Sequence, residues 1–118
     1  MRREDRVLIV EDNASVANAI EAAGQEFCYT CDRATDGWEA IEKLETEQYA
    51  AIVIDTDVPR HSGFGVLTYL HEEVGEDLPN VIVMTNSDRD EVRRKVSGNL
   101  TIVRKDDAVR ELTRVLCG

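Results

Sequence analysis

Two apolar stretches of the chain each end in a pair of acidic residues. Glu11 and Asp12 directly follow the first stretch, and Asp55 and Asp57 follow the second. Carboxylates that share a partly dry cleft repel one another strongly unless a cation neutralises them. Mg²⁺ prefers a few carboxylates completed by water and phosphate oxygens, whereas Ca²⁺ wants more ligands than are visible here. If the fold brings these acids to one point, they form a candidate Mg²⁺ site.

A hydroxyl group and an ammonium group follow two further apolar stretches, at Thr85 and Lys105. A metal site alone does not explain these two side chains. A hydroxyl donor and an ammonium group suit a phosphoryl group that the metal bridges. The reaction class is then phosphoryl transfer to a carboxylate, in which positioning and charge neutralisation supply nearly all the catalysis. Asp55 is the best nucleophile, because it ends the apolar run expected at the centre of the sheet.

Short apolar runs and helical patterns alternate along the chain and must position these groups. Four runs are rich in β-branched residues and lack polar alternation, which is typical of parallel strands buried on both faces. They cover residues 7–10, 50–54, 81–84 and 100–103, and a weaker run at 29–34 indicates a strand nearer the edge. Because parallel strands need crossovers, the order predicts a three-layer α/β/α sandwich. Ligands of such sheets bind beyond the carboxyl ends of the strands, where the candidate residues lie.

Apolar residues at helical spacing fill the gaps between the runs. Asp36-Gly37 supplies a start for the second helix, and Gly75 an end for the third. We expect Trp38, on the second stripe, to be partly buried. The five stripes are Val16, Ala19, Ile20 and Ala23; Trp38, Ile41 and Leu44; Leu67, Leu70 and Val74; Val92 and Val96; and Val109, Leu112 and Leu116.

Length and charge limit the classes of function. The chain has 118 residues, which fits a single domain spanning residues 1–118. Its 14 basic and 24 acidic residues give a net charge of −10, which argues against direct binding to nucleic acid or an anionic membrane. The absence of a membrane-length apolar run and of a signal-peptide core predicts a cytoplasmic location. Three cysteines are an odd number and are interpreted as reduced thiols.

The chain resembles response-regulator receiver domains along its whole length. Residues 7–13 resemble the acidic-pair strand of that family, residues 34–41 its second-helix entry, and residues 52–59 with Gly63 its phosphoacceptor strand and loop. Thr85 and Lys105 match the family's hydroxyl and lysine, and Gly98 lies in the usual register before Lys105. The resemblance implies the flavodoxin-like (βα)5 fold, with a five-stranded parallel sheet in the order 2-1-3-4-5.

The resemblance also implies roles for the candidate residues. Glu11 and Asp12 would help to bind Mg²⁺, with Asp12 preferred as the direct ligand, and Asp55 would be both ligand and phosphate acceptor. Asp57 would offer its backbone carbonyl to the metal. Lys105 would pair with the phosphate, and Thr85 would hydrogen-bond it.

The implied function is that of a signalling switch, which catalyses only its own phosphorylation and dephosphorylation. A histidine kinase or a histidine phosphotransfer protein would supply the phosphoryl group. The output would pass to a downstream protein, through the face around the fourth helix, the fifth strand and the fifth helix.

Three positions depart from the family pattern. Ile102 replaces the usual aromatic residue, so no ring can rotate there as part of the switch. Asp106 replaces the proline that normally follows the lysine, and a cis bond before Asp106 would cost roughly 3 kcal/mol. We therefore expect the loop that holds Lys105 to be trans and displaced. Asn86 replaces a small residue and is expected to crowd the path to the phosphate.

Two alternative functions stay open. Ile102 and Asp106 favour a pseudo-receiver, which would act as a protein-interaction module without phosphorylation. The segment 55–58 resembles the nucleophile motif of haloacid-dehalogenase-type phosphatases, in which Asp57 would be a general acid. Cys28 and Cys31 have the spacing of a metal or redox motif, but in a predicted strand they would point to opposite faces, so inert thiols are expected.

Overall fold

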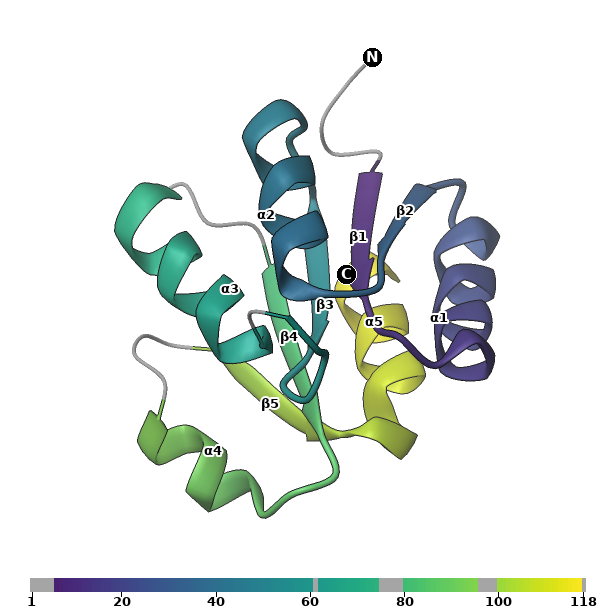
Figure 1. Ribbon diagram of the computed structural model, residues 1–118. Helices are drawn as coiled ribbons and strands as arrows, with labels where there is room; N and C mark the ends of the chain where they lie inside the picture. Colours follow the sequence, from purple (N-terminus) through teal and green to yellow (C-terminus); the bar gives the residue numbers. More distant parts are fainter. Residues whose placement is uncertain (1–5, 61, 75–79, 96–99, 118) are drawn as a thin grey trace.

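The computed structural model describes residues 6–60, 62–74, 80–95 and 100–117. Strands and helices alternate along the chain, and the strands form one parallel sheet in the order β2-β1-β3-β4-β5 (Figure 1). The elements are β1 (Arg6–Val10), α1 (Ala14–Glu26), β2 (Thr30–Ala34), α2 (Gly37–Thr46), β3 (Ala51–Asp55), α3 (Gly63–Tyr69), a π-helical turn (Leu70–Val74), β4 (Asn80–Thr85), α4 (Arg89–Lys95), β5 (Thr101–Arg104), a 3₁₀ turn (Lys105–Asp107) and α5 (Ala108–Cys117). The predicted fold class and strand order are confirmed.

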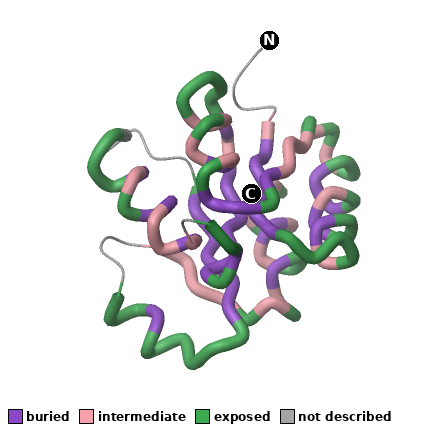
Figure 2. The backbone as a smooth tube through the Cα atoms, in the orientation of Figure 1, coloured by how far each residue is buried: buried purple, intermediate pink, exposed green. Residues whose placement is uncertain are grey.

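The sheet separates two apolar cores, one on each face. Alternate side chains of a strand enter opposite cores, so that Leu8 and Val10 pack on one face and Val7 and Ile9 on the other. Helix α2, helix α3 and Val92 of α4 contribute to the first core, and helices α1 and α5 contribute to the second. Strands β1 and β3 are buried almost along their whole length (Figure 2), which explains their runs of apolar residues without polar alternation.

The helices that flank the site start at capping residues. Asn13 accepts hydrogen bonds from the backbone N–H groups of Ser15 and Val16 at the start of α1. Asp36 accepts one from the N–H of Glu39, 2.8 Å away, so the predicted start of the second helix is confirmed. In α1 the buried face holds Ala17, Ile20, Ala23 and Gly24, whereas Ala19 is exposed, so the predicted stripe was wrong at that position.

Two further expectations about single residues are corrected. Trp38 is 55% exposed rather than partly buried. Cys28 lies in the turn after α1 with a φ of 64°, and not in a strand, because this turn reverses the chain before β2 begins. Burial, with Glu21 and Asp32 nearby, raises the pKa of the Cys31 thiol to about 11, which disfavours the reactive thiolate. Predictions that involve four residues stay untested by the structure. Gly75, Val96 and Gly98 lie outside the described residues, and so does the side chain of Val74.

None of the helices in the described ranges is long and apolar enough to cross a membrane.

Candidate functional site

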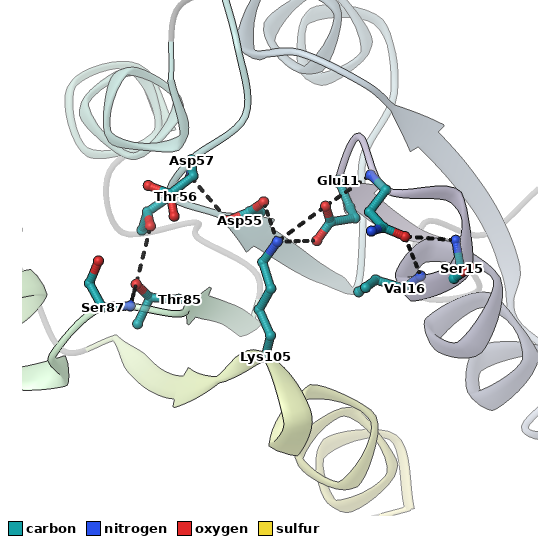
Figure 3. A network of polar contacts seen from close by, with 10 residues as sticks. Glu11, Ser15, Val16, Asp55, Thr56, Asp57, Thr85, Ser87 and Lys105 are labelled. Atoms are coloured by element: carbon teal, nitrogen blue, oxygen red, sulfur yellow. Dashed lines mark hydrogen bonds and ion pairs between the residues drawn. The ribbon is translucent and has the colours of Figure 1, made fainter.

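The sheet brings the chemically important residues to one edge, at the carboxyl ends of its strands. Asp55 is the last residue of β3, Thr85 is the last residue of β4, and Glu11 directly follows β1. Lys105 begins the 3₁₀ turn that follows β5. Figure 3 shows Lys105 reaching across this edge, so that its amino group lies between the carboxylates of Glu11 and Asp55.

Three carboxylates lie close enough to share one metal ion. One oxygen from each of Glu11, Asp12 and Asp55 lies within 4.8 Å of the other two. Glu11 and Asp55 are buried and Asp12 is exposed, so the cluster has a solvent-facing side. An ion here would have room for water and for an incoming group on that side. This set of hard oxygen donors matches what Mg²⁺ prefers.

A buried carboxylate oxygen supports the fit to a cation. Oε1 of Glu11 is buried, and its one polar contact among the described residues is the ammonium group of Lys105, whose Nζ lies 3.2 Å away. The other oxygen, Oε2, accepts hydrogen bonds from the N–H of Asn13 at 3.0 Å and from Lys105 at 3.4 Å. A buried carboxylate oxygen with a single cationic partner is stabilised by a second cation. A metal ion bound by Glu11 would be that cation, so the residues present fit the ion.

Without a metal ion, the ammonium group of Lys105 neutralises part of the negative charge of Glu11 and Asp55. Its Nζ lies 2.8 Å from Oδ2 of Asp55 and 3.2 Å from Oε1 of Glu11. Burial alone would lower the pKa of Lys105, but the hydrogen bonds and charges of Asp55 and Glu11 outweigh burial and raise it. The pKa of Glu11 is raised, mainly because burial disfavours its charged form and partly because Asp55 is near. The ammonium group therefore stays charged, and one of its two acidic partners binds a proton more readily than usual.

Thr85 is fully buried and ends the strand next to that of Asp55, and its hydroxyl group hydrogen-bonds to residues other than Asp55. Its hydroxyl oxygen accepts a hydrogen bond from the N–H of Ser87 at 2.9 Å and one from the hydroxyl of Thr56 at 3.4 Å (Figure 3). The hydroxyl group of Thr85 carries one proton that it can donate to an acceptor. Thr56 was missed by the sequence reasoning. Its only signal was its place directly after Asp55.

The segment after Asp55 holds the side chain of Asp55 in place. The N–H of Asp57 donates to Oδ1 of Asp55 at 3.0 Å, and the side chain of Asp57 is exposed. At Gly63, the first residue of α3, an added Cβ would lie 2.3 Å from the carbonyl oxygen of Asp55 and 2.8 Å from Cα of Thr56. Only glycine lets α3 begin so close to the end of β3.

The expected displacement of the Lys105 loop was wrong. Every peptide bond in the described part of the chain is trans, as expected, yet Lys105 still reaches both carboxylates. Asp106 continues a 3₁₀ turn that leads directly into α5, and the long lysine side chain covers the remaining distance to its oppositely charged partners. Ile102 is half-buried and packs against the core that contains α2 and α3.

The chain was compared with protein families and with individual relatives. The family model described as response regulator receiver domain matches residues 7–116. Response regulator MprA of Mycobacterium ulcerans is 34% identical over 93 residues, which are 79% of this chain and 38% of the relative. The transcriptional regulatory protein DltR of Streptococcus agalactiae is 34% identical over 82 residues, 70% of this chain and 36% of the relative. The chain therefore spans well under half the length of these relatives.

Solved structures share the fold at lower identity. The chemotaxis response regulator CheY4 of Vibrio cholerae superposes with a TM-score of 0.77 at 21% identity, over 95% of this chain and 98% of that one. The signal receiver domain of an HD domain-containing protein from Pseudomonas fluorescens has a TM-score of 0.82 at 18% identity, over 98% and 93% of the two chains. With its strand order, its acidic edge and a family match over nearly all of its length, the chain belongs to the response regulator receiver domain family.

Proposed function

We propose that this protein is a phosphoacceptor receiver of a two-component phosphorelay, which takes a phosphoryl group onto Asp55 in a Mg²⁺-dependent reaction. The observation that carries the proposal is the convergence of Glu11, Asp12 and Lys105 on the Asp55 carboxylate. An isolated acidic residue on the surface would not be surrounded by two further carboxylates and an ammonium group. The donor would be a histidine kinase or a histidine phosphotransfer protein.

Each residue has a distinct part in this reaction. Glu11, Asp12 and Asp55 would hold Mg²⁺, with a further oxygen from the backbone carbonyl of Asp57. When bound, the ion neutralises the charge on phosphoryl oxygens and keeps them close to the acceptor. Oδ1 of Asp55 is fixed by the N–H of Asp57, which limits rotation of the nucleophile.

The remaining two residues would bind the transferred group. Lys105 already lies 2.8 Å from Oδ2 of Asp55, so its ammonium group can pair with a phosphoryl oxygen after a small movement of the side chain. Thr85 would donate its hydroxyl proton to the phosphoryl group after rotating away from Thr56. That rotation would couple phosphorylation to the carboxyl end of β4.

We further propose that the output passes to a downstream protein through the face formed by α4, β5 and α5. Ile102 lies on β5 and is half-buried, so the rearrangement there would be a shift of packing and not the rotation of an aromatic ring. Residues 1–118 would act as a single receiver domain in the cytoplasm. With a net charge of −10, the domain would make no direct contact with nucleic acid or membrane.

Phosphorylation by a small donor tests the proposal. The protein is mixed with acetyl phosphate and Mg²⁺, and its intact mass is measured over time. We expect one added phosphoryl group in the wild type and none in Asp55→Asn. Asp57→Asn is the matched control, because it removes a neighbouring acid but keeps the backbone carbonyl, and it should still be labelled.

Two results would reject the proposal. Labelling of Asp55→Asn to the same extent as the wild type would place the phosphoryl group elsewhere. No labelling of the folded wild type, even after long incubation with Mg²⁺, would support the pseudo-receiver alternative.

A further inference from the structure

A surface groove runs between helices α2 and α3, which lie side by side on one face of the sheet (Figure 1). We call it the α2–α3 groove; its volume is about 460 Å³, and it is separate from the acidic edge of the sheet. Its apolar lining comes mainly from aromatic and branched side chains, and its rim is acidic. The groove is lined by Trp38, Ile41 and Glu45 of α2, by Gly65, Thr68 and Tyr69 of α3, and by Glu72 and Glu73 of the turn that follows α3.

The lining includes apolar surface that is open to solvent. Trp38 is 55% exposed and is, with Val109, one of two large hydrophobic residues that are exposed in the described part of the chain. Trp38 and Ile41 are three residues apart in α2, so they share one face of that helix, and Tyr69 faces them from α3. Tyr69 and Ile41 are half-buried, so the groove combines one exposed aromatic side chain with apolar surface that is partly open to solvent. Such a grouping in a concave surface is typical of a binding site.

The rim carries concentrated negative charge. Glu45, Glu72 and Glu73 are all exposed, and none of them forms an ion pair with another described residue. Their field reaches the lining, since burial together with the charges of Glu45 and Glu73 raises the pKa of the Tyr69 hydroxyl. A cation placed in this groove would meet carboxylates on the rim and aromatic faces below them.

The backbone is irregular where two of the three rim residues lie. Helix α3 changes into a π-helical turn at Leu70–Val74, and this turn carries Glu72 and Glu73. A π turn is rare and occurs frequently at functional sites, because the wider turn changes the direction of the side chains that follow. Here it places both glutamates at the groove.

We propose that the α2–α3 groove binds a basic, amphipathic segment of a partner protein. Arginine or lysine side chains of the segment lie between the rim carboxylates and the rings of Trp38 and Tyr69, and its apolar side chains contact Ile41. The rim repels nucleic acid and anionic lipid, so a basic protein segment is the occupant that the charges select. This docking surface is distinct from the face of α4, β5 and α5, and it does not depend on phosphorylation of Asp55.

Trp38 makes the test direct, because it is the single tryptophan of the chain. The probe is a synthetic, tryptophan-free helical peptide with leucine on one face and arginine on the flanks of that face. We expect a saturable change in Trp38 fluorescence during titration with this peptide. The double variant Glu72→Gln/Glu73→Gln should bind it about fivefold more weakly, because two favourable ion pairs are lost.

A matched control separates the groove from the overall charge of the protein. The double variant Glu26→Gln/Asp90→Asn has the same change in net charge at exposed positions of α1 and α4, outside the groove, and it should bind the peptide like the wild type. The proposal is overturned by the absence of saturable binding, by equal weakening in both double variants, or by equal affinity for a peptide with citrulline in place of arginine. Self-association of the chain that Glu72→Gln/Glu73→Gln abolishes would also overturn it, because the groove would then bind a second copy.

Discussion

Replacing Lys105 with methionine is expected to lower the free energy of unfolding by about 3 kcal/mol at neutral pH without divalent metal. Lys105 is the only cation within ion-pair distance of Glu11 and Asp55 among the described residues, and the side chains of these acids are 0% and 1% exposed. The variant leaves two buried negative charges facing each other. Urea denaturation in the presence of a chelator measures the loss. Added Mg²⁺ should restore a large part of it, because the ion neutralises the same carboxylates.

The pH dependence of this variant follows from the pKa shifts. The pKa of Lys105 lies above its ordinary 10.5, so its contribution to wild-type stability is present below that pH and is lost as the pH rises further. The pKa of Glu11 lies above its ordinary 4.5, so as the pH falls this carboxylate is protonated at a higher pH than an ordinary glutamate. The deficit of the variant should therefore shrink as the pH falls towards the pKa of Glu11.

Lys95→Met is the matched control for the Lys105 variant. Lys95 is more than half exposed and lies 3.9 Å from the exposed Glu91. Its Nζ also lies 5.5 Å from the centre of the Phe64 ring. Because Lys95 is exposed in both contacts, their loss should change stability by about 1 kcal/mol or less. Equal stability of the Lys105 and Lys95 variants would mean that the acidic edge does not depend on Lys105.

Gly63→Ala is expected to cost about 3 kcal/mol, through steric overlap with backbone. The added Cβ would meet the carbonyl oxygen of Asp55 at 2.3 Å, and a backbone atom cannot move aside as a flexible side chain can. Either α3 or the end of β3 must shift, so Asp55, the proposed phosphoacceptor, should also lose its fixed position. Thermal and urea denaturation measure the stability, and the rate of labelling by acetyl phosphate measures the effect on Asp55.

Gly65→Ala tests whether this cost belongs to position 63. Gly65 lies two residues further along α3 and is half-buried. Alanine favours helix over glycine by roughly 0.5–1 kcal/mol, so this variant should be neutral or slightly more stable. A Gly63 variant as stable as the Gly65 variant would show that the start of α3 tolerates a side chain.

The sheet and the convergence of the acids could be predicted because both follow from strong, local patterns. Apolar runs without polar alternation indicate strands covered on both faces, and residues that directly follow such runs must meet at one edge of a parallel sheet. Glu11, Asp55 and Lys105 were found by this reasoning. Their positions depend on strand order and not on the details of side-chain packing.

Other features depend on tertiary contacts, which the spacing of residues along the sequence does not reveal. Trp38 lies on a helical stripe, but it is exposed because the neighbouring helix α3 leaves a groove beside it. The hydrogen bonds of Thr85 come from Ser87 and from Thr56, which lies in the turn after the neighbouring strand β3. The missing proline after Lys105 led to an expected displacement, which the 3₁₀ turn and the attraction of two buried carboxylates prevent.

Calorimetric titration with Mg²⁺ tests most directly whether Glu11, Asp12 and Asp55 share one ion. We expect one Mg²⁺ per wild-type chain, with clearly weaker binding in Asp12→Asn and nearly unchanged binding in Asp57→Asn. A folded wild-type chain that binds no Mg²⁺ at millimolar concentrations, or an Asp12→Asn variant that binds as tightly as the wild type, would contradict a shared metal site at this edge of the sheet.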